Sequence, residues 1–169
     1  ARSGDALAGE RELQAGRVTV TQLADVANWM SNAGDLQQAM LWCRWAVYLN
    51  PLEMRAWAAW INVGAAYDRK QDWQAALAVY RAGLEKQEKA SLDINRASFM
   101  YRIGMSINRL AGLNNQPEAI LWFNQAIENG HFLAEWDRAS ALINRGNWYR
   151  ADRAQYAVEV YLKDYQAAL

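Results

Sequence analysis

The sequence predicts an all-α fold built from repeated pairs of antiparallel helices, and three observations carry this prediction. Of the 169 residues, 53% are apolar and only two are Pro, so a helical globular chain is favoured and global disorder is excluded. Small residues recur at a fixed spacing, which indicates an internal repeat. Apolar residues follow one another at three- and four-residue steps between turn-forming residues, as amphipathic helices require.

The repeat is visible as small and aromatic residues at set intervals. Gly64 is followed twelve residues later by Ala76, four later by Tyr80 and three later by Gly83. Small residues let two helix axes approach closely, so Gly64 is expected to face Ala76. The same intervals upstream give Ala27, Ala39, Cys43 and Ala46, and downstream, with the first gap stretched to fifteen, Gly104, Ala119, Phe123 and Ala126.

Each of the first two units is predicted to contain two helices. In the first unit, Asn50-Pro51 ends the second helix because Pro cannot continue a helix and restricts the residue before it. In the second unit, Asp72 is placed to cap the later helix through its charge and its side-chain oxygen. The apolar stripes are Leu23, Val26, Ala27 and Met30, then Leu36, Ala39, Met40, Cys43, Ala46 and Val47, then Trp57, Trp60, Val63, Gly64 and Tyr67, and then Trp73, Ala76, Leu77, Tyr80 and Leu84.

The third unit and the chain ends are less regular. A run of turn formers at 111–116 precedes Pro117, which opens a helix at the position that tolerates Pro. The final helix, 154–169, is interpreted as either the natural cap or a cut face. We expect a single domain with an N-terminal helix at 1–19, repeats at 20–53, 57–90 and 97–131, and a degenerate repeat or capping helices at 134–169.

These residues resemble the tetratricopeptide repeat pattern over roughly Val20 to His131. The third unit, from Pro117 to His131, also resembles the related Sel-like repeats. The resemblance implies a right-handed superhelical solenoid of antiparallel helix pairs, about three repeats plus terminal helices. In that family the first helix of each pair lines a concave groove and the second lies on the convex side. The matching residues are Trp60, Val63-Gly64, Tyr67, Ala76, Tyr80 and Gly83, with Ala39, Ala46 and Asn50-Pro51 in the first unit.

Composition argues against several classes of function. Eighteen basic and eighteen acidic residues give zero formal charge, which argues against nucleic-acid binding, and no apolar run is long enough for membrane insertion. One Cys and one His cannot build an ordinary metal cage. His131 lies in a predicted turn, and Cys43 takes the aromatic position of its repeat, where burial makes a thiol unreactive. We therefore expect no enzyme, and no catalytic, metal or cofactor site.

The predicted binding site is the concave groove. Asn recurs at its positions in every unit, and an amide offers a donor and an acceptor to the backbone of an extended peptide. Arg adds charge and a planar fork for carboxylates, and the carboxylates that balance these Arg are expected to lie elsewhere. The groove residues that the resemblance implies are Asn28, Asn62, Arg69, Tyr101, Arg102, Asn108, Arg109, Asn144 and Asn147.

The sequence thus predicts a non-catalytic module that binds a peptide or partner segment, acidic in character, as an adaptor or assembly factor in a bacterial complex. The alternative is a structural spacer or homo-oligomerisation module that uses its convex face and end helix. Trp42, Trp45, Trp122 and Trp148 are interpreted either as core between repeats or as an exposed aromatic patch on the convex side. The excess of Arg over Lys favours a periplasmic over a cytoplasmic location, without deciding between them.

Overall fold

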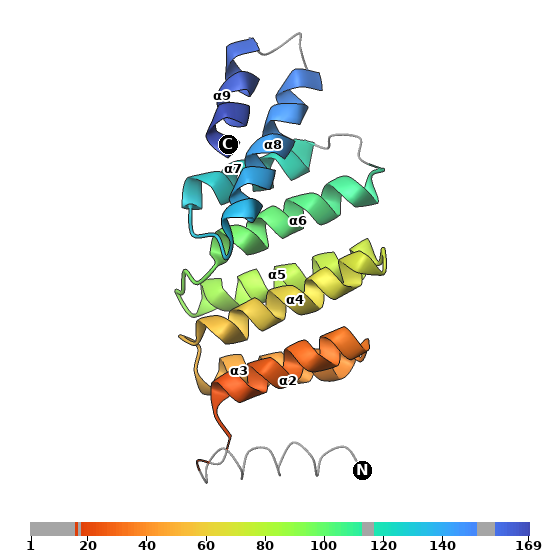
Figure 1. The fold of residues 1–169 in the computed structure, drawn as a ribbon, viewed down its shortest axis with the longest axis vertical. Helices are drawn as coiled ribbons and strands as arrows, with labels where there is room; N and C mark the ends of the chain where they lie inside the picture. The colour runs from red at the N-terminus through yellow and green to blue at the C-terminus, as the bar shows by residue number, and fades with distance from the viewer. Residues whose placement is uncertain (1–15, 17, 113–116, 152–157) are drawn as a thin grey trace. The chain divides into compact units, whose positions relative to one another are not determined.

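The computed structural model describes residues 16, 18–112, 117–151 and 158–169, and within these ranges the chain forms helices and no strand (Figure 1). The fold is therefore all-α, as predicted. Most of the expected N-terminal helix, including 1–15, and the start of the expected final helix at 154–157 lie outside the described residues. The helices are α2 (Val20–Ala33), α3 (Leu36–Leu49), α4 (Met54–Arg69), α5 (Trp73–Lys89), α6 (Arg96–Leu110), α7 (Pro117–Asn129), α8 (Glu135–Ala151) and α9 (Val158–Ala168).

The chain divides into an N-terminal unit, Ala1–Val63, and a C-terminal unit, Gly64–Leu169, with the boundary inside α4. In the N-terminal unit, α2 packs against α3. The Thr19 side chain accepts from the backbone N–H of Gln22 (3.2 Å), and the Gln22 side chain accepts from the backbone N–H of Thr19 (2.8 Å), so α2 begins with a capping box. Gly34 ends α2 at a φ of 89°, a left-handed conformation that glycine adopts without strain.

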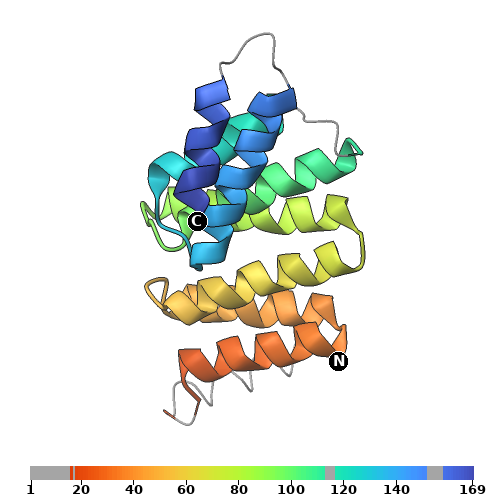
Figure 2. The same cartoon turned by 45° about the horizontal axis from the view of Figure 1, so that its top comes forward.

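In the C-terminal unit, consecutive helices pack against one another from α5 to α9, and α6 also contacts α8 (Figure 2). The Asp72 side chain accepts from the backbone N–H of Ala75 (3.1 Å), and Pro117 is the first residue of α7, so both predicted helix starts are confirmed. α6 is the most enclosed of these helices, because its buried residues occupy most of its circumference. The few side chains of α6 that reach solvent are therefore flanked by residues of the neighbouring helices.

The small residues of the repeat accommodate aromatic rings. A Cβ atom on Gly64 would lie 2.3 Å from Cε1 of Tyr80, and one on Gly104 would lie 2.7 Å from Cε1 of Phe123. In the third unit the backbone oxygen of Ala119, which corresponds to Ala76, also lies 3.1 Å from where a Cβ atom of Gly104 would lie, and the facing of Gly64 and Ala76 stays a prediction. In each unit an aromatic side chain of the second helix, Tyr80 or Phe123, fills the space that the glycine of the first helix leaves. The corresponding residues of the N-terminal unit, Ala27 and Cys43, are both fully buried.

Candidate functional site

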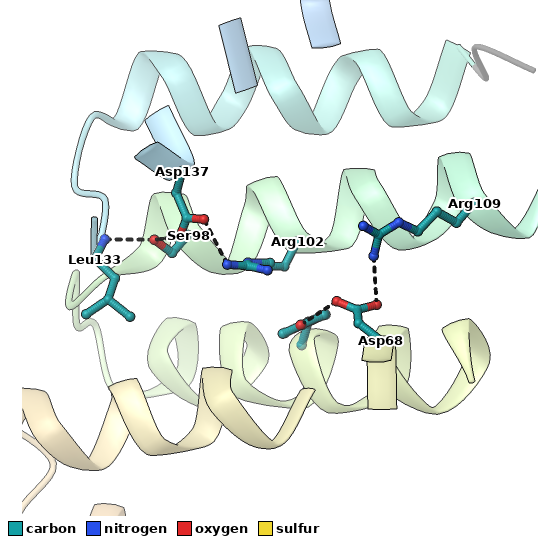
Figure 3. Close-up of polar contacts among 7 residues, drawn as sticks. Asp68, Ser98, Arg102, Arg109, Leu133 and Asp137 are labelled. Atoms are coloured by element: carbon teal, nitrogen blue, oxygen red, sulfur yellow. Dashed lines mark hydrogen bonds and ion pairs between the residues drawn. The ribbon is translucent and has the colours of Figure 1, made fainter. Parts of the chain in front are cut away.

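Two arginines of α6, Arg102 and Arg109, each pair with a carboxylate (Figure 3). Each guanidinium also lies over a tryptophan ring. Arg102 Nη2 donates to Oδ1 of Asp137 on α8 (2.9 Å). The Arg102 guanidinium also lies 4.9 Å from the centre of the Trp136 ring, a distance at which the ring face attracts a cation. Trp136 itself is 57% exposed, so this arginine lies at the edge of an accessible aromatic surface.

Asp137 fixes Arg102 from below the surface, because its carboxylate is 1% exposed. It accepts from Arg102 and from Ser98 Oγ (3.0 Å), and Ser98 Oγ in turn accepts from the backbone N–H of Leu133 (2.7 Å). Burial raises the pKa of Asp137, and the opposing effects of Arg102 and Ser98 are smaller. The chain of contacts ties α6, the α7–α8 connection and α8 together at one point.

Arg109 repeats this arrangement two turns along α6. Its Nη1 lies 3.4 Å from Oδ1 of Asp68, and its guanidinium lies 4.7 Å from the centre of the Trp73 ring. Asp68 is buried at the end of α4, and its Oδ2 accepts from the hydroxyl of Tyr80 (2.8 Å). Burial raises the pKa of Asp68, while the Tyr80 hydrogen bond and the charges of Arg109 and Arg102 lower it less. The pKa of Tyr80 is raised by burial first and by Asp68 second.

Neither guanidinium uses all its hydrogen-bonding capacity. An arginine has five N–H donors, and the contact of Arg109 with Asp68, at 3.4 Å, is an ion pair without a short hydrogen bond. Nε of Arg102 is buried and has no hydrogen-bond partner among the described residues. Arg102 and Arg109 are separated by seven residues, which places them on one face of α6 about 10.5 Å apart along its axis. Such a pair can recognise carboxylates or carbonyl oxygens.

The charge around these arginines differs from the sequence expectation. The expectation that the balancing carboxylates lie elsewhere is wrong for Arg102 and Arg109, because Asp137 and Asp68 face them directly. Arg145 of α8 is balanced too, with its Nε donating to Oδ2 of Asp164 on α9 (2.7 Å). The first helices of the C-terminal unit, α6, α8 and the part of α4 from Gly64 onward, hold seven Arg and three carboxylates. Glu88 of α5 and Asp164 of α9 balance Arg96 and Arg145, so an excess of two positive charges remains.

Three further predicted groove residues, the half-buried Asn28 and the exposed Asn62 and Arg69, lie on surfaces of their own units. Asn62 is exposed, and its Nδ2 donates to Oδ1 of Asn28 (2.9 Å), so α2 and α4 of the N-terminal unit are joined by an amide pair. Arg69 is exposed at the end of α4, next to Asp68 in the sequence. Both exposed positions are accessible to a ligand.

The remaining predicted residues serve packing. Tyr101 is 4% exposed, with its ring centre 6.1 Å from that of Phe123, and Asn108 is also buried. Nδ2 of Asn144 donates to the backbone oxygen of Ser140 within α8 (2.7 Å), and Oδ1 of Asn147 accepts from the hydroxyl of Tyr165 on α9 (2.7 Å). The structure thus brings Arg102 and Arg109 together on one face, while these four side chains are engaged inside the fold.

Sequence reasoning missed Asp68, Asp137, Trp73 and Trp136 as members of this cluster. Asp68 carried a usable signal, because it stands four residues after Gly64 on the side expected to be buried. A buried carboxylate requires a partner, and Tyr80 on the next helix supplies one. Trp136 is the residue before Asp137 and carried no such signal in the sequence.

Three other features of the described residues bear on function. They contain no group of three or more His, Cys, Asp or Glu side chains arranged to hold a metal ion. No helix among them has the length and apolar character needed to cross a membrane. His131 is exposed, and its Nδ1 lies 2.6 Å from Oδ2 of Asp93.

Comparison with known proteins establishes the fold. No family model matches the chain, and no curated protein matches it. Among solved structures, the crystal structure of BtubC (BKLC) from P. vanneervenii is similar, with a TM-score of 0.59 and 16% sequence identity over 99% of this chain and 71% of that one. At this identity the similarity concerns the fold alone, and it confirms the predicted helical-repeat arrangement.

Proposed function

We propose that the protein is a non-catalytic interaction module that binds an extended acidic segment of a partner protein along the first helices of its C-terminal unit. The observation that carries the proposal is the pair Arg102 and Arg109, each fixed by a buried carboxylate and an aromatic ring on one face of α6. In this role the chain acts as an adaptor or assembly factor, and we place it in a bacterial complex.

The fixed geometry favours binding because it lowers the entropic cost. A free arginine side chain loses about 2 kcal/mol of rotamer entropy when it is immobilised, whereas Arg102 and Arg109 are already ordered by their internal contacts. The side chains of Arg102 and Arg109 are 17% and 32% exposed, so part of each guanidinium can reach a ligand carboxylate, although Nε of Arg102 is buried. The excess of Arg on the first helices attracts an acidic segment over longer range and raises its association rate.

The spacing of the two arginines suggests how the ligand is arranged. An extended polyproline II segment rises about 3.1 Å per residue with three residues per turn, so acidic side chains three residues apart lie on one side, about 9.3 Å from each other. This matches the separation of about 10.5 Å along α6. Met105, half-buried between the two arginines, offers an apolar contact to the residues between the acidic ones. We propose an acidic-x-x-acidic ligand motif.

The resemblance to tetratricopeptide repeats supports the proposal, because in that family the first helices form the peptide-binding groove. Membership of that family is itself part of the proposal. The exposed residue Arg69, in the same unit, is available to pair with a further carboxylate of the ligand.

Selection from a random peptide display library tests the function. The wild-type protein is expected to enrich peptides with two acidic residues three apart, and the double variant Arg102→Gln/Arg109→Gln is expected not to. Arg81→Gln is the matched control, since Arg81 is an exposed arginine of α5 that pairs with Glu118 outside the cluster. Enrichment of the same peptides by the double variant, or of no acidic motif by the wild type, would contradict the proposal.

A second candidate is a spacer or homo-oligomerisation module that uses the end helix α9. The observation in its favour is Leu162, an apolar side chain that is 45% exposed on α9. Sedimentation velocity over a range of concentrations decides the question. Self-association that is lost in Leu162→Asp favours this candidate, and a monomer at all concentrations excludes it.

A further inference from the structure

The outer face of α3 is apolar although it is exposed. Leu41 and Tyr48 are 47% and 72% exposed, and Trp45 lies half-buried between them, with its ring edge-to-face to that of Tyr48 at 5.9 Å. The opposite face of the same helix carries the buried residues Leu36, Ala39, Cys43, Ala46 and Val47. α3 is thus apolar on both sides, a pattern typical of a helix that is covered on both sides.

The second helix of the next repeat provides an internal comparison. The intervals that relate the repeats align Leu41, Trp45 and Tyr48 of α3 with Ala78, Ala82 and Glu85 of α5. The same alignment matches Leu52, after α3, with Lys89. The outer face of α5 is charged, as a solvated helix face should be. The repeat therefore does not require large apolar side chains at all these positions, because α5 lacks them and α7 has only Leu121, followed by Gln125 and Glu128.

The spacing of the exposed side chains indicates that a helix covers them. Leu41, Trp45, Tyr48 and Leu52 follow one another at intervals of four, three and four residues, which is the seam of a heptad pattern. Because α3 ends at Leu49, Leu52 lies off the helix, in the turn that follows, where it is 69% exposed and adds an apolar side chain near the end of the seam. An amphipathic helix that lies along such a seam places its own apolar residues between these side chains.

The charge on α3 indicates which residues flank the apolar seam of the covering partner helix. Arg44 is exposed beside the seam, and α3 contains no carboxylate. A second copy of the chain would bring another Arg44 to the same seam with nothing on α3 to balance it. A partner helix with acidic flanking residues complements Arg44.

We propose that the seam formed by Leu41, Trp45, Tyr48 and Leu52 is a second binding site, which takes an amphipathic helix of a partner protein with an apolar seam and acidic flanks. This site lies in the N-terminal unit and does not depend on the groove function proposed for the C-terminal unit. The two sites would let one chain hold two different partner segments.

The test uses two synthetic helical peptides of about 20 residues with Leu at the seam positions, one with Glu and one with Lys at the flanking positions. The wild-type chain is expected to bind the Glu peptide at least about tenfold more tightly than the Lys peptide. The double variant Leu41→Ala/Tyr48→Glu gives α3 the residues that α5 carries, and it should lose at least about tenfold in affinity for the Glu peptide. Leu121→Ala is the control, since Leu121 is 60% exposed at the same repeat position of α7.

Circular dichroism establishes that the variants fold, and Arg102→Gln/Arg109→Gln should bind the Glu peptide as well as the wild type does. Four outcomes would overturn the proposal. The first is failure of the wild type to bind the Glu peptide, and the second is equal binding of both peptides. The third is a wild-type dimer that Tyr48→Glu makes monomeric. The fourth is binding to phosphatidylserine vesicles that the double variant loses while its affinity for the Glu peptide is unchanged. The third would assign the seam to a second copy of the chain, and the fourth to a lipid surface.

Discussion

The ring of Tyr80 occupies the volume that a side chain at position 64 would need, with Cε1 of Tyr80 2.3 Å from where a Cβ atom of residue 64 would lie. Gly104 and Phe123 repeat this relationship at 2.7 Å. The ring of Tyr80 is fully buried and its hydroxyl donates to Asp68, so it cannot move aside easily. Glycine at these positions is therefore required by packing.

The first prediction concerns Gly64→Ala. Alanine gains about 1 kcal/mol in helix propensity over glycine, but overpacking against a buried ring costs about 1–3 kcal/mol. We expect a net loss of unfolding free energy in chemical denaturation. In a Tyr80→Ala background, where the ring is absent, the same substitution should stabilise the fold by up to about 1 kcal/mol. Stabilisation in both backgrounds would show that the ring does not constrain residue 64.

The second prediction compares two alanines of α5. Ala76 is fully buried and Ala78 is exposed. Ala76→Leu should lower the unfolding free energy by about 1–3 kcal/mol because the added atoms have no space, whereas Ala78→Leu should change it by less than about 0.5 kcal/mol. Urea titrations of the two variants provide the measurement. Equal losses would mean that the alignment of the repeats is wrong.

The third prediction concerns Cys43. Burial raises the pKa of the Cys43 thiol to about 12, so the reactive thiolate is scarce at neutral pH. A thiol reagent at pH 8 should leave the folded protein unlabelled and should modify one thiol per chain after unfolding in denaturant. Rapid labelling of the folded protein, at the rate found in denaturant, would contradict the burial of Cys43.

The fourth prediction concerns the pH dependence of Asp137. Burial holds its pKa in the folded protein above the unfolded value of about 3.9, so the folded state binds the proton more tightly. The stability that this carboxyl contributes is then fully present below the unfolded pKa and is lost as the pH rises through the folded pKa.

The measurement for Asp137 is the unfolding free energy of the wild type minus that of Asp137→Asn, followed from about pH 4 to about pH 7. We expect this difference to fall as the pH rises, since only the wild type carries the titrating group. A difference that grows with pH would mean that the Arg102 charge outweighs burial and lowers the pKa.

Local signals made most of the fold predictable from the sequence. The starts of α5 and α7 depend on Asp72 and Pro117, whose effects act within one helical turn. The spacing showed that a small residue is needed at position 64, but the close approach of the Tyr80 ring to it depends on how the two helices pack.

The candidate site was predictable only in part, because its contacts join distant residues. Arg102 and Arg109 followed from the repeat pattern, but their partners Asp137 and Asp68 lie on α8 and α4. No local rule predicts such pairs. Asn144 and Asn147 fit the expected groove positions, yet each found an internal acceptor or donor, on Ser140 and Tyr165, once α8 and α9 were packed. Half-buried amides such as these pair with polar groups that the packing of the helices brings near them.

The most direct test of the account is calorimetric titration of the wild-type chain with a peptide that carries Glu residues three apart, at about 0.05 M and about 0.3 M salt. The account predicts binding that weakens with salt, a loss of about tenfold in affinity in Arg102→Gln and again in Arg109→Gln, and a weaker salt response in both variants. Arg81→Gln should bind as the wild type does. Affinity that is unchanged in both arginine variants would contradict the assignment of this face of α6 as the binding site.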